Sequence, residues 1–147
     1  METEAISKVA IVAKSAEQKS AQALKLAQQS HEKNCNQLDQ LKSYKNEYEA
    51  TYGAVGNRGV AARQLQDYRT FLSKLDQAIM LQAGTVQSSK ESLDAVRDEW
   101  LSSSRHRSSL DKLLDKRRTE TQKAQEKAEQ KESDERSLVS RHDVSEP

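Results

Sequence analysis

His31 and Cys35 carry the most reactive side chains that the sequence places close together. They are four residues apart, and on a helix this spacing puts both on one face, as two metal ligands would require. A structural zinc site needs four ligands, whereas the sequence holds one cysteine and two further histidines, His106 and His142. The sequence therefore favours a surface histidine beside a small thiol, and we expect neither a metal nor another cofactor.

Glycines gather at one place, since Gly53, Gly56 and Gly59 are three of the four in the chain. A phosphate-binding loop would follow a strand and end in Gly-Lys-Ser or Gly-Lys-Thr, and neither feature is present. Gly53 suits the left-handed residue after a helix end, and Asn57 can cap a following helix. The segment predicts a tight turn between two helices.

Two basic clusters, Arg105-His106-Arg107 and Lys116-Arg117-Arg118, could contact the phosphates of a nucleic acid. Acidic Asp111, Asp115 and Glu120 interleave with them, and the whole chain has 24 basic and 23 acidic residues. With no net field to attract DNA, a solvated helical face is favoured and we expect no nucleic-acid partner. A DNA-binding coiled coil, in which a basic region adjoins heptads, stays as an alternative.

The composition is typical of long helices, with 32% charged, 34% hydrophobic and 4% aromatic residues and a single proline at the end. A compact domain would need more apolar side chains and more turn residues. The longest apolar run, Val9 to Ala13, is far shorter than the ~20 residues of a membrane span. The start of the chain lacks the basic region of a secretory signal, and a lone cysteine fits a reducing compartment. We expect a soluble, cytoplasmic protein whose partners are proteins.

Between Leu65 and Trp100, apolar residues recur in steps of three and four. This 3.5-residue period keeps one apolar seam facing a partner helix, as in a coiled coil. Gln82 and Ser89 are its polar interruptions. The same spacing recurs from Ile6 to Tyr48, where many positions are alanine. The seam of the second segment comprises Leu65, Tyr68, Leu72, Leu75, Ile79, Val86, Leu93, Val96 and Trp100.

Because the connection is short, the two helices must be antiparallel neighbours. We predict an all-α fold, a long antiparallel two-helix coiled-coil hairpin with a C-terminal helix overhang, forming one domain over 1–147. Helix one spans about 3–52, the loop 53–59, helix two about 60–130 and a flexible tail about 131–147. Two paired helices offer no concave pocket for titratable groups, so we expect no enzymatic activity.

Hairpin symmetry about Gly56 predicts that facing residues have numbers summing to about 113. Trp100 then faces Ala13, and Ser30 shares a polar layer with Gln82, which would fix the register at some cost in stability. Five of the six aromatic residues fall near the turn. Their arc is wide for a two-helix seam, so packing and an exposed binding patch both stay open for Tyr44, Tyr48, Tyr52, Tyr68 and Phe71.

Three segments are specific enough to compare with a known family. They are the spacing Gln37, Leu41, Tyr44, Glu47 and Tyr48, the block Tyr68, Phe71, Leu75, Ala78 and Ile79, and Glu99-Trp100-Leu101. Over most of its length the chain resembles the flagellar export protein FliJ family. The resemblance implies a cytoplasmic stalk component of the flagellar type III export apparatus, an antiparallel coiled coil like the central stalk of rotary ATPases. A stalk protein of a virulence-type III secretion system, or a purely structural coiled coil, is the alternative.

The resemblance also implies partners: the hexameric export ATPase FliI, the export-gate membrane protein FlhA and the export substrate chaperones. The chain would lie at the cytoplasmic face of the inner membrane, peripheral to it through these partners only. The family's gate-binding positions match Gln37, Leu41, Tyr44, Tyr48, Phe71, Leu75, Ala78 and Gln82, where Gln82 replaces a histidine of the family pattern.

Heptad counting buries Leu41, Tyr48 and Leu75, which conflicts with a fully exposed gate site. For the ATPase ring, the family places the chain termini in the pore, and a slim alanine-rich tip would suit that position. We expect the ring-binding residues to be Ile6, Val9, Ala13, Ala16, Trp100, Leu110 and Leu114.

Overall fold

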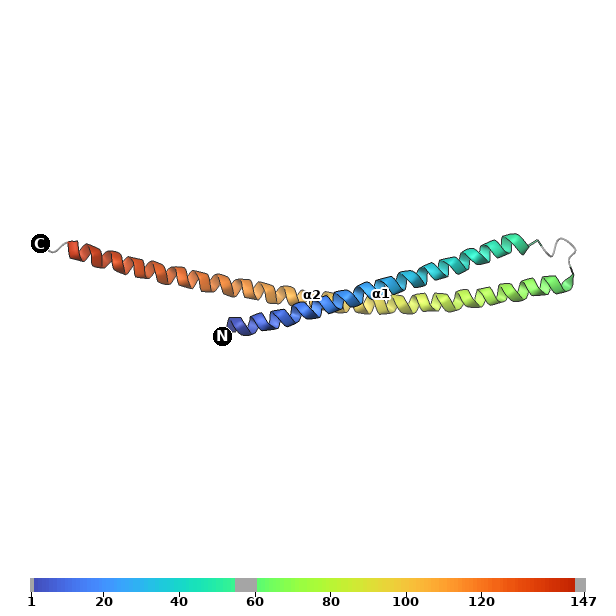
Figure 1. Cartoon of the computed structure of the whole chain (residues 1–147), viewed down its shortest axis with the longest axis horizontal. Coiled ribbons are helices and arrows are strands. Elements are labelled where there is room, and N and C mark those ends of the chain that lie inside the picture. Colours follow the sequence, from blue (N-terminus) through green and yellow to red (C-terminus); the bar gives the residue numbers. More distant parts are fainter. Residues whose placement is uncertain (1, 55–60, 145–147) are drawn as a thin grey trace. The chain divides into compact units, whose positions relative to one another are not determined.

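Two long α-helices make up the described part of the chain (Figure 1). The structure is a computed structural model that describes residues 2–54 and 61–144, with side chains up to His142. Helix α1 spans Glu2–Tyr52 and helix α2 spans Ala62–Val144. The two helices pack against each other, and these ranges contain no strand, so the predicted all-α helical hairpin is confirmed.

Helix α1 has close to the predicted bounds, but Gly53 after its end is not in the left-handed conformation that the sequence predicts. Glu2 and Glu4 lie in the first turn, where negative charge interacts favourably with the helix dipole. At the other end, the Gly53 N–H donates a hydrogen bond of 2.7 Å to the carbonyl of Glu49. A Cβ atom at Gly53 would collide with that same carbonyl oxygen, so the position requires glycine. The predicted Asn57 cap, with most of the 53–59 loop, lies outside the described residues.

Helix α2 is longer than predicted. Its described start is Ala62, and the prediction that it ends near residue 130 is wrong, because it continues to Val144. Side-chain pairs one turn apart support the extension, such as Arg136 with Glu132 at 2.7 Å and Gln130 with Asp134 at 3.1 Å. Each such pair contributes only a few tenths of a kcal/mol, yet no breaker opposes them before Pro147. The predicted flexibility of 131–144 stays a prediction, and 145–147 lie outside the described residues.

The helices form two units. The central unit is Gln18–Ser102, and the terminal unit combines Met1–Glu17 with Ser103–Pro147. In the central unit, Lys45 meets Asp76 and His31 meets Ser89, so the paired helices are antiparallel. The buried apolar side chains are Leu75 and Leu93 in the central unit, and Ala13 and Leu114 in the terminal unit. Each unit is therefore held by a narrow seam, without a thick core.

The two helices pair in a different register from the one that the sequence predicts. In the central unit, His31 meets Ser89 and Lys45 meets Asp76, so facing numbers sum to about 120 instead of 113. Gln82 consequently lies against Asn34, and the predicted polar layer with Ser30 is wrong. Symmetry about the loop does not predict the observed register, because the register depends on which side chains interlock along the seam.

The terminal unit has ion pairs at both ends of its short two-helix stretch. Arg117 Nη1 lies 2.6 Å from a carboxylate oxygen of Glu2, and Arg107 Nη1 lies 3.2 Å from one of Glu17. From Arg118 to His142, every α2 side chain is exposed, which is the predicted C-terminal overhang. Within residues 2–54 and 61–144, neither helix has a stretch apolar enough to cross a membrane.

Candidate protein-binding surfaces

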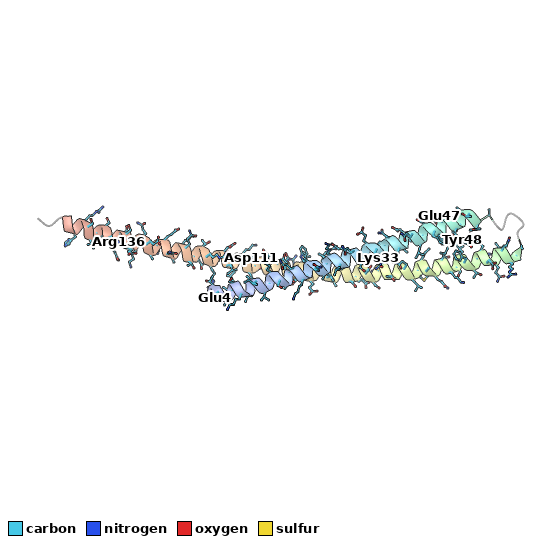
Figure 2. The ribbon with its side chains drawn as sticks, in the orientation of Figure 1. Glu4, Lys33, Glu47, Tyr48, Asp111 and Arg136 are labelled. Atoms are coloured by element: carbon cyan, nitrogen blue, oxygen red, sulfur yellow. The ribbon has the colours of Figure 1, made fainter. Side chains whose placement is uncertain are left out.

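Tyr48 is the centre of an aromatic cluster that joins α1 to α2. Its ring stacks on Tyr68 with centroids 5.4 Å apart, and it contacts Phe71 at 4.6 Å and Tyr52 at 4.9 Å. Tyr44 meets Phe71 edge to face at 6.3 Å. Figure 2 shows Tyr48 on the α2 side of α1 and the neighbouring Glu47 pointing away. These five rings lie within a few turns on two helices, so they form one continuous surface.

This aromatic cluster is both core and surface. Tyr44 is 49% exposed and Phe71 is 36% exposed, whereas Tyr48 and Tyr68 are half-buried between the helices. Leu75 is buried at 7% exposure. Heptad counting and a binding patch are therefore both right for part of the cluster: the half-buried Tyr48 ring supports Phe71, and the exposed Tyr44 ring packs on Phe71. Of the other predicted gate residues, Gln37 is exposed and Leu41, Ala78 and Gln82 are half-buried.

An ion pair borders the aromatic cluster. Lys45 Nζ lies 2.6 Å from a carboxylate oxygen of Asp76 on α2 and 3.8 Å from one of Glu49. The hydrogen bond to Asp76 raises the pKa of Lys45 above its ordinary 10.5. Desolvation by the surrounding rings raises the pKa of Tyr48 above 10.0. Both groups keep their protons at neutral pH, so the patch presents a neutral aromatic surface beside a neutralised pair.

Polar residues of both helices meet about two turns further along. The Gln82 amide donates a hydrogen bond of 3.0 Å to the Asn34 carbonyl and lies 3.4 Å from Oε1 of Gln37. Two predicted gate residues, Gln37 and Gln82, are thus in contact across the helices. Together they form a polar edge to the aromatic cluster.

His31 and Cys35 are part of the seam, so the prediction of a surface pair is wrong. Both are half-buried, and Cys35 Sγ lies 3.5 Å from His31 Nε2. Ser89 donates its hydroxyl hydrogen to the Val86 carbonyl at 2.9 Å, so it must accept from His31 Nδ1 at 2.8 Å. This sets the histidine tautomer and leaves Nε2 to accept from the thiol. Among the described residues, no group of three histidine, cysteine or acidic side chains could hold a metal.

The predicted ring-binding residues divide between seam and surface. In the terminal unit, Ala13 and Leu114 are buried and Ile6 and Leu110 are half-buried, so these four hold the helices together. Val9 and Ala16 are exposed, while the half-buried Trp100 belongs to the central unit.

Sequence analysis missed two apolar residues of the terminal unit. Ile11 and Val12 have exposed fractions of 67% and 68%, more than the predicted Val9. They fall between the seam positions that heptad counting selects, so the signal that could have found them is an apolar residue at an outward heptad position. With Val9, they make α1 the more apolar surface of this unit.

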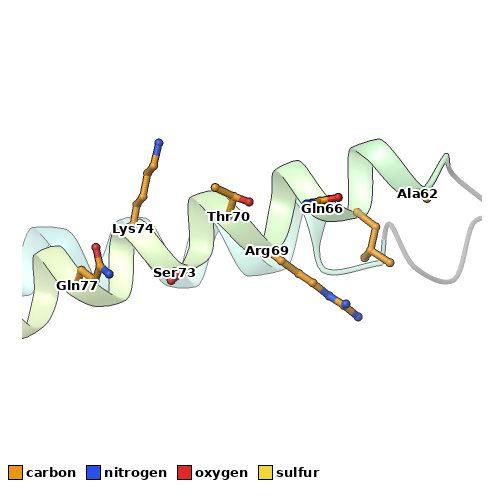
Figure 3. Close-up of a pocket in the computed structure, with 8 residues that line it drawn as sticks. Ala62, Gln66, Arg69, Thr70, Ser73, Lys74 and Gln77 are labelled. Atoms are coloured by element: carbon orange, nitrogen blue, oxygen red, sulfur yellow. The ribbon is translucent and has the colours of Figure 1, made fainter.

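An open groove of about 750 Å³ runs along one side of α2 (Figure 3). All of its lining residues belong to this one helix, and Figure 3 shows Arg69 and Lys74 extending from it into solvent. A shallow groove on a single helix does not bring titratable groups together, so it offers a contact surface. The lining comprises Ala62, Leu65, Gln66, Arg69, Thr70, Ser73, Lys74 and Gln77.

Comparison with known proteins gives one match. No curated protein and no solved structure is similar to the chain at a significant level. A family model described as the flagellar FliJ protein matches residues 2–142, which include both helices almost to their ends. The match covers the aromatic cluster and most of the terminal unit, and we conclude that this chain belongs to the flagellar FliJ protein family.

Proposed function

We propose that this chain is the stalk that couples the hexameric export ATPase FliI to the export-gate protein FlhA. Membership of the FliJ family makes it a component of the flagellar type III export apparatus, and that match is the observation that carries the proposal. It also favours the flagellar apparatus over the virulence-type alternative. The chain acts on the ATPase of its partner and has no catalysis of its own.

The aromatic cluster is the surface proposed for the gate. Exposed Phe71 packs on Tyr48, and exposed Tyr44 packs on Phe71, so both lose little side-chain freedom when a partner covers them. Aromatic side chains supported in this way are typical interface hot spots. Gln37 and Gln82 supply hydrogen-bonding groups at the edge, and buried Leu75 supports the surface from beneath without contacting the partner.

The terminal unit is the part proposed to enter the ATPase ring. Its exposed apolar residues Val9, Ile11 and Val12 can contact the pore, while Ala13 and Leu114 keep α1 joined to α2. The α2 overhang beyond Arg117 is a single helix about 10–12 Å across, a width that a ring pore can admit.

The proposal extends to the substrate chaperones and to location. Handling of empty chaperones is the third activity implied by the family resemblance, and the paired helices offer it a long exposed polar surface. Through FlhA and FliI the chain is held, peripherally, at the cytoplasmic face of the inner membrane. The neutral overall charge, +1 at pH 7, favours contacts with protein over contacts with lipid or nucleic acid.

Two double variants test whether the aromatic cluster binds FlhA and the terminal unit binds FliI. Tyr44→Ala with Phe71→Ala should weaken binding to the cytoplasmic part of FlhA at least tenfold, since each exposed anchor contributes ~1–2 kcal/mol. Ile11→Glu with Val12→Glu should abolish stimulation of FliI hydrolysis and leave gate binding intact. Leu26→Ala, which removes an exposed side chain outside both surfaces, is the matched control.

Circular dichroism must show unchanged helicity for every variant. If Tyr44→Ala with Phe71→Ala leaves gate binding unaltered, the aromatic cluster is not the gate surface. If none of the four substitutions alters either activity, the stalk assignment itself fails.

A further inference from the structure

Met80 and Leu81 are the most exposed large apolar side chains among the residues that the structure describes, at 76% and 75%. They are neighbours on α2 in the central unit, on the side opposite to the seam residues Leu75, Ile79 and Val86. Two bulky apolar side chains in full contact with water are not explained by packing within the chain. They mark α2 as a surface that another molecule can cover.

This outward face of α2 is also the longest uncharged stretch of the chain. No acidic or basic residue occurs from Gln77 to Ser89, although 32% of all residues are charged. Directly beside the stretch, Asp76 is paired with Lys45 of α1, and Lys90 falls one turn after the seam residue Val86. The nearest charges on the outward side are therefore Lys74 before the stretch and Glu91 after it, and their signs are opposite. The face therefore runs from positive, through apolar, to negative.

Gly84 lies one turn from Met80 and Leu81, in the middle of α2 and exposed. A Cβ atom added here would meet nothing within 4 Å, so no contact inside the chain requires glycine. Glycine is the least favourable residue after proline inside a helix, and its use here lacks an internal reason. A missing side chain does create a shallow hollow into which a neighbouring helix can place a large one.

We propose that this face binds a second copy of the chain, with the two α2 helices antiparallel. A two-fold axis between Leu81 and Gly84 places each Leu81 over the Gly84 hollow of the other copy, because an isologous contact pairs each residue with its reciprocal. The same axis brings Lys74 of each copy opposite Glu91 of the other. One symmetric arrangement thus fills the hollow, covers the apolar side chains and pairs both charges.

The self-complementary order of charges is what favours a second copy over another protein. Lys74, Leu81, Gly84 and Glu91 are spaced so that reversing the face superimposes opposite charges, which a surface for an unrelated partner has no reason to do. About four turns of helix bury less than the ~800 Å² per partner of a standard interface. The dimer is accordingly weak and forms at high local concentration.

Dimerisation is compatible with the proposed gate surface. Phe71 and Ala78 lie on the flank of α2 that adjoins α1, whereas Gln77, Leu81 and Gly84 lie on the opposite side. A second copy would therefore leave the aromatic cluster free. Lys74 and Gln77, which line the open groove of Figure 3, would be covered at its end nearest to Met80.

Sedimentation velocity of the full-length chain over a wide concentration range tests the proposal. The wild type should shift reversibly from monomer to dimer. Gly84→Ala should weaken the dimer about tenfold by filling the hollow, while raising the thermal stability of the monomer through better helix propensity. A monomer at every concentration would overturn the proposal and assign the face to another protein.

Charge exchange tests the antiparallel register. Lys74→Glu and Glu91→Lys should each weaken self-association about tenfold, because each places like charges opposite each other twice. The double exchange should restore the dimer. Mixing the two single variants should give a heterodimer, in which all four charges are again paired. A dimer indifferent to these exchanges would show that a different face is used.

Discussion

The Nδ1 atom of His31 on α1 lies 2.8 Å from the Oγ atom of Ser89 on α2. Ser89 in turn donates to the Val86 carbonyl, and Cys35 Sγ lies 3.5 Å from the other ring nitrogen of His31. Every polar atom of this layer that faces the seam has a partner, so it can fix the register without leaving an unpaired buried group.

Ser89→Ala should therefore destabilise the protein by about 1–3 kcal/mol, since it leaves the half-buried His31 N–H without an acceptor. Ser89→Ala with His31→Leu should recover most of that loss, because the half-buried N–H that lacks an acceptor is then removed. Denaturant unfolding followed by circular dichroism measures both, with exposed Ser88→Ala as the control. Equal destabilisation by Ser88→Ala would contradict the role of this layer.

Leu75 and Leu93 are the buried anchors of the central unit. Leu75→Ala should lower the free energy of unfolding by about 2–4 kcal/mol through lost burial and an unfilled seam position. Leu26→Ala, at a similarly apolar but exposed side chain, should change it by less than ~0.5 kcal/mol. Thermal and denaturant unfolding compare them, and similar costs for the two variants would disprove the assigned seam.

Stability should fall at alkaline pH. The folded-state pKa of Lys45 lies above 10.5 and that of Tyr48 above 10.0, so folding favours the protonated form of both. Their contribution is complete below about pH 10 and disappears as the pH rises through the folded-state values. The denaturation midpoint should be constant from pH 7 to 9 and then decrease.

Lys45→Met with Tyr48→Phe removes both titrating groups while keeping the apolar contacts. Its denaturation midpoint should decrease less steeply above pH 10 than that of the wild type. A wild-type midpoint that rises with pH in this range would reverse the predicted sign.

The overhang should exchange its amide hydrogens much faster than the seam. Side chains from Arg118 to His142 are all exposed and α2 has no partner helix there, so local opening costs little free energy. Hydrogen exchange should show low protection over 118–142 and high protection around Leu75 to Leu93. Equal protection of the two segments would mean that another copy or segment covers the overhang.

Much of the fold could be predicted from the sequence, because the 3.5-residue spacing around Leu75 and Leu93 and the glycine at position 53 are local signals. The register could not, since the contact of Tyr48 with Tyr68 and Phe71 depends on how rings interlock between distant segments. Helix α2 ends later than its polar composition predicts, because side-chain pairs one turn apart, such as Glu132 with Arg136, support it there.

The candidate binding surfaces, too, could be predicted from the sequence only in part. Heptad counting assigns each position as either buried or exposed. In a pair of helices, however, a ring such as that of Tyr48 is only half-buried. Tyr44 and Phe71 could be selected through the family resemblance. Ile11, Val12, Met80 and Leu81 could not, because an outward apolar residue has meaning only once the seam has been located.

The central claim is that one chain joins the ATPase to the gate, and co-sedimentation with both partners tests it most directly. The cytoplasmic part of FlhA should sediment with hexameric FliI when this chain is present. Tyr44→Ala with Phe71→Ala should release FlhA while the chain itself stays with FliI. If FlhA and FliI instead compete for the chain, or if the double variant still joins them, the proposed coupling through two separate surfaces is contradicted.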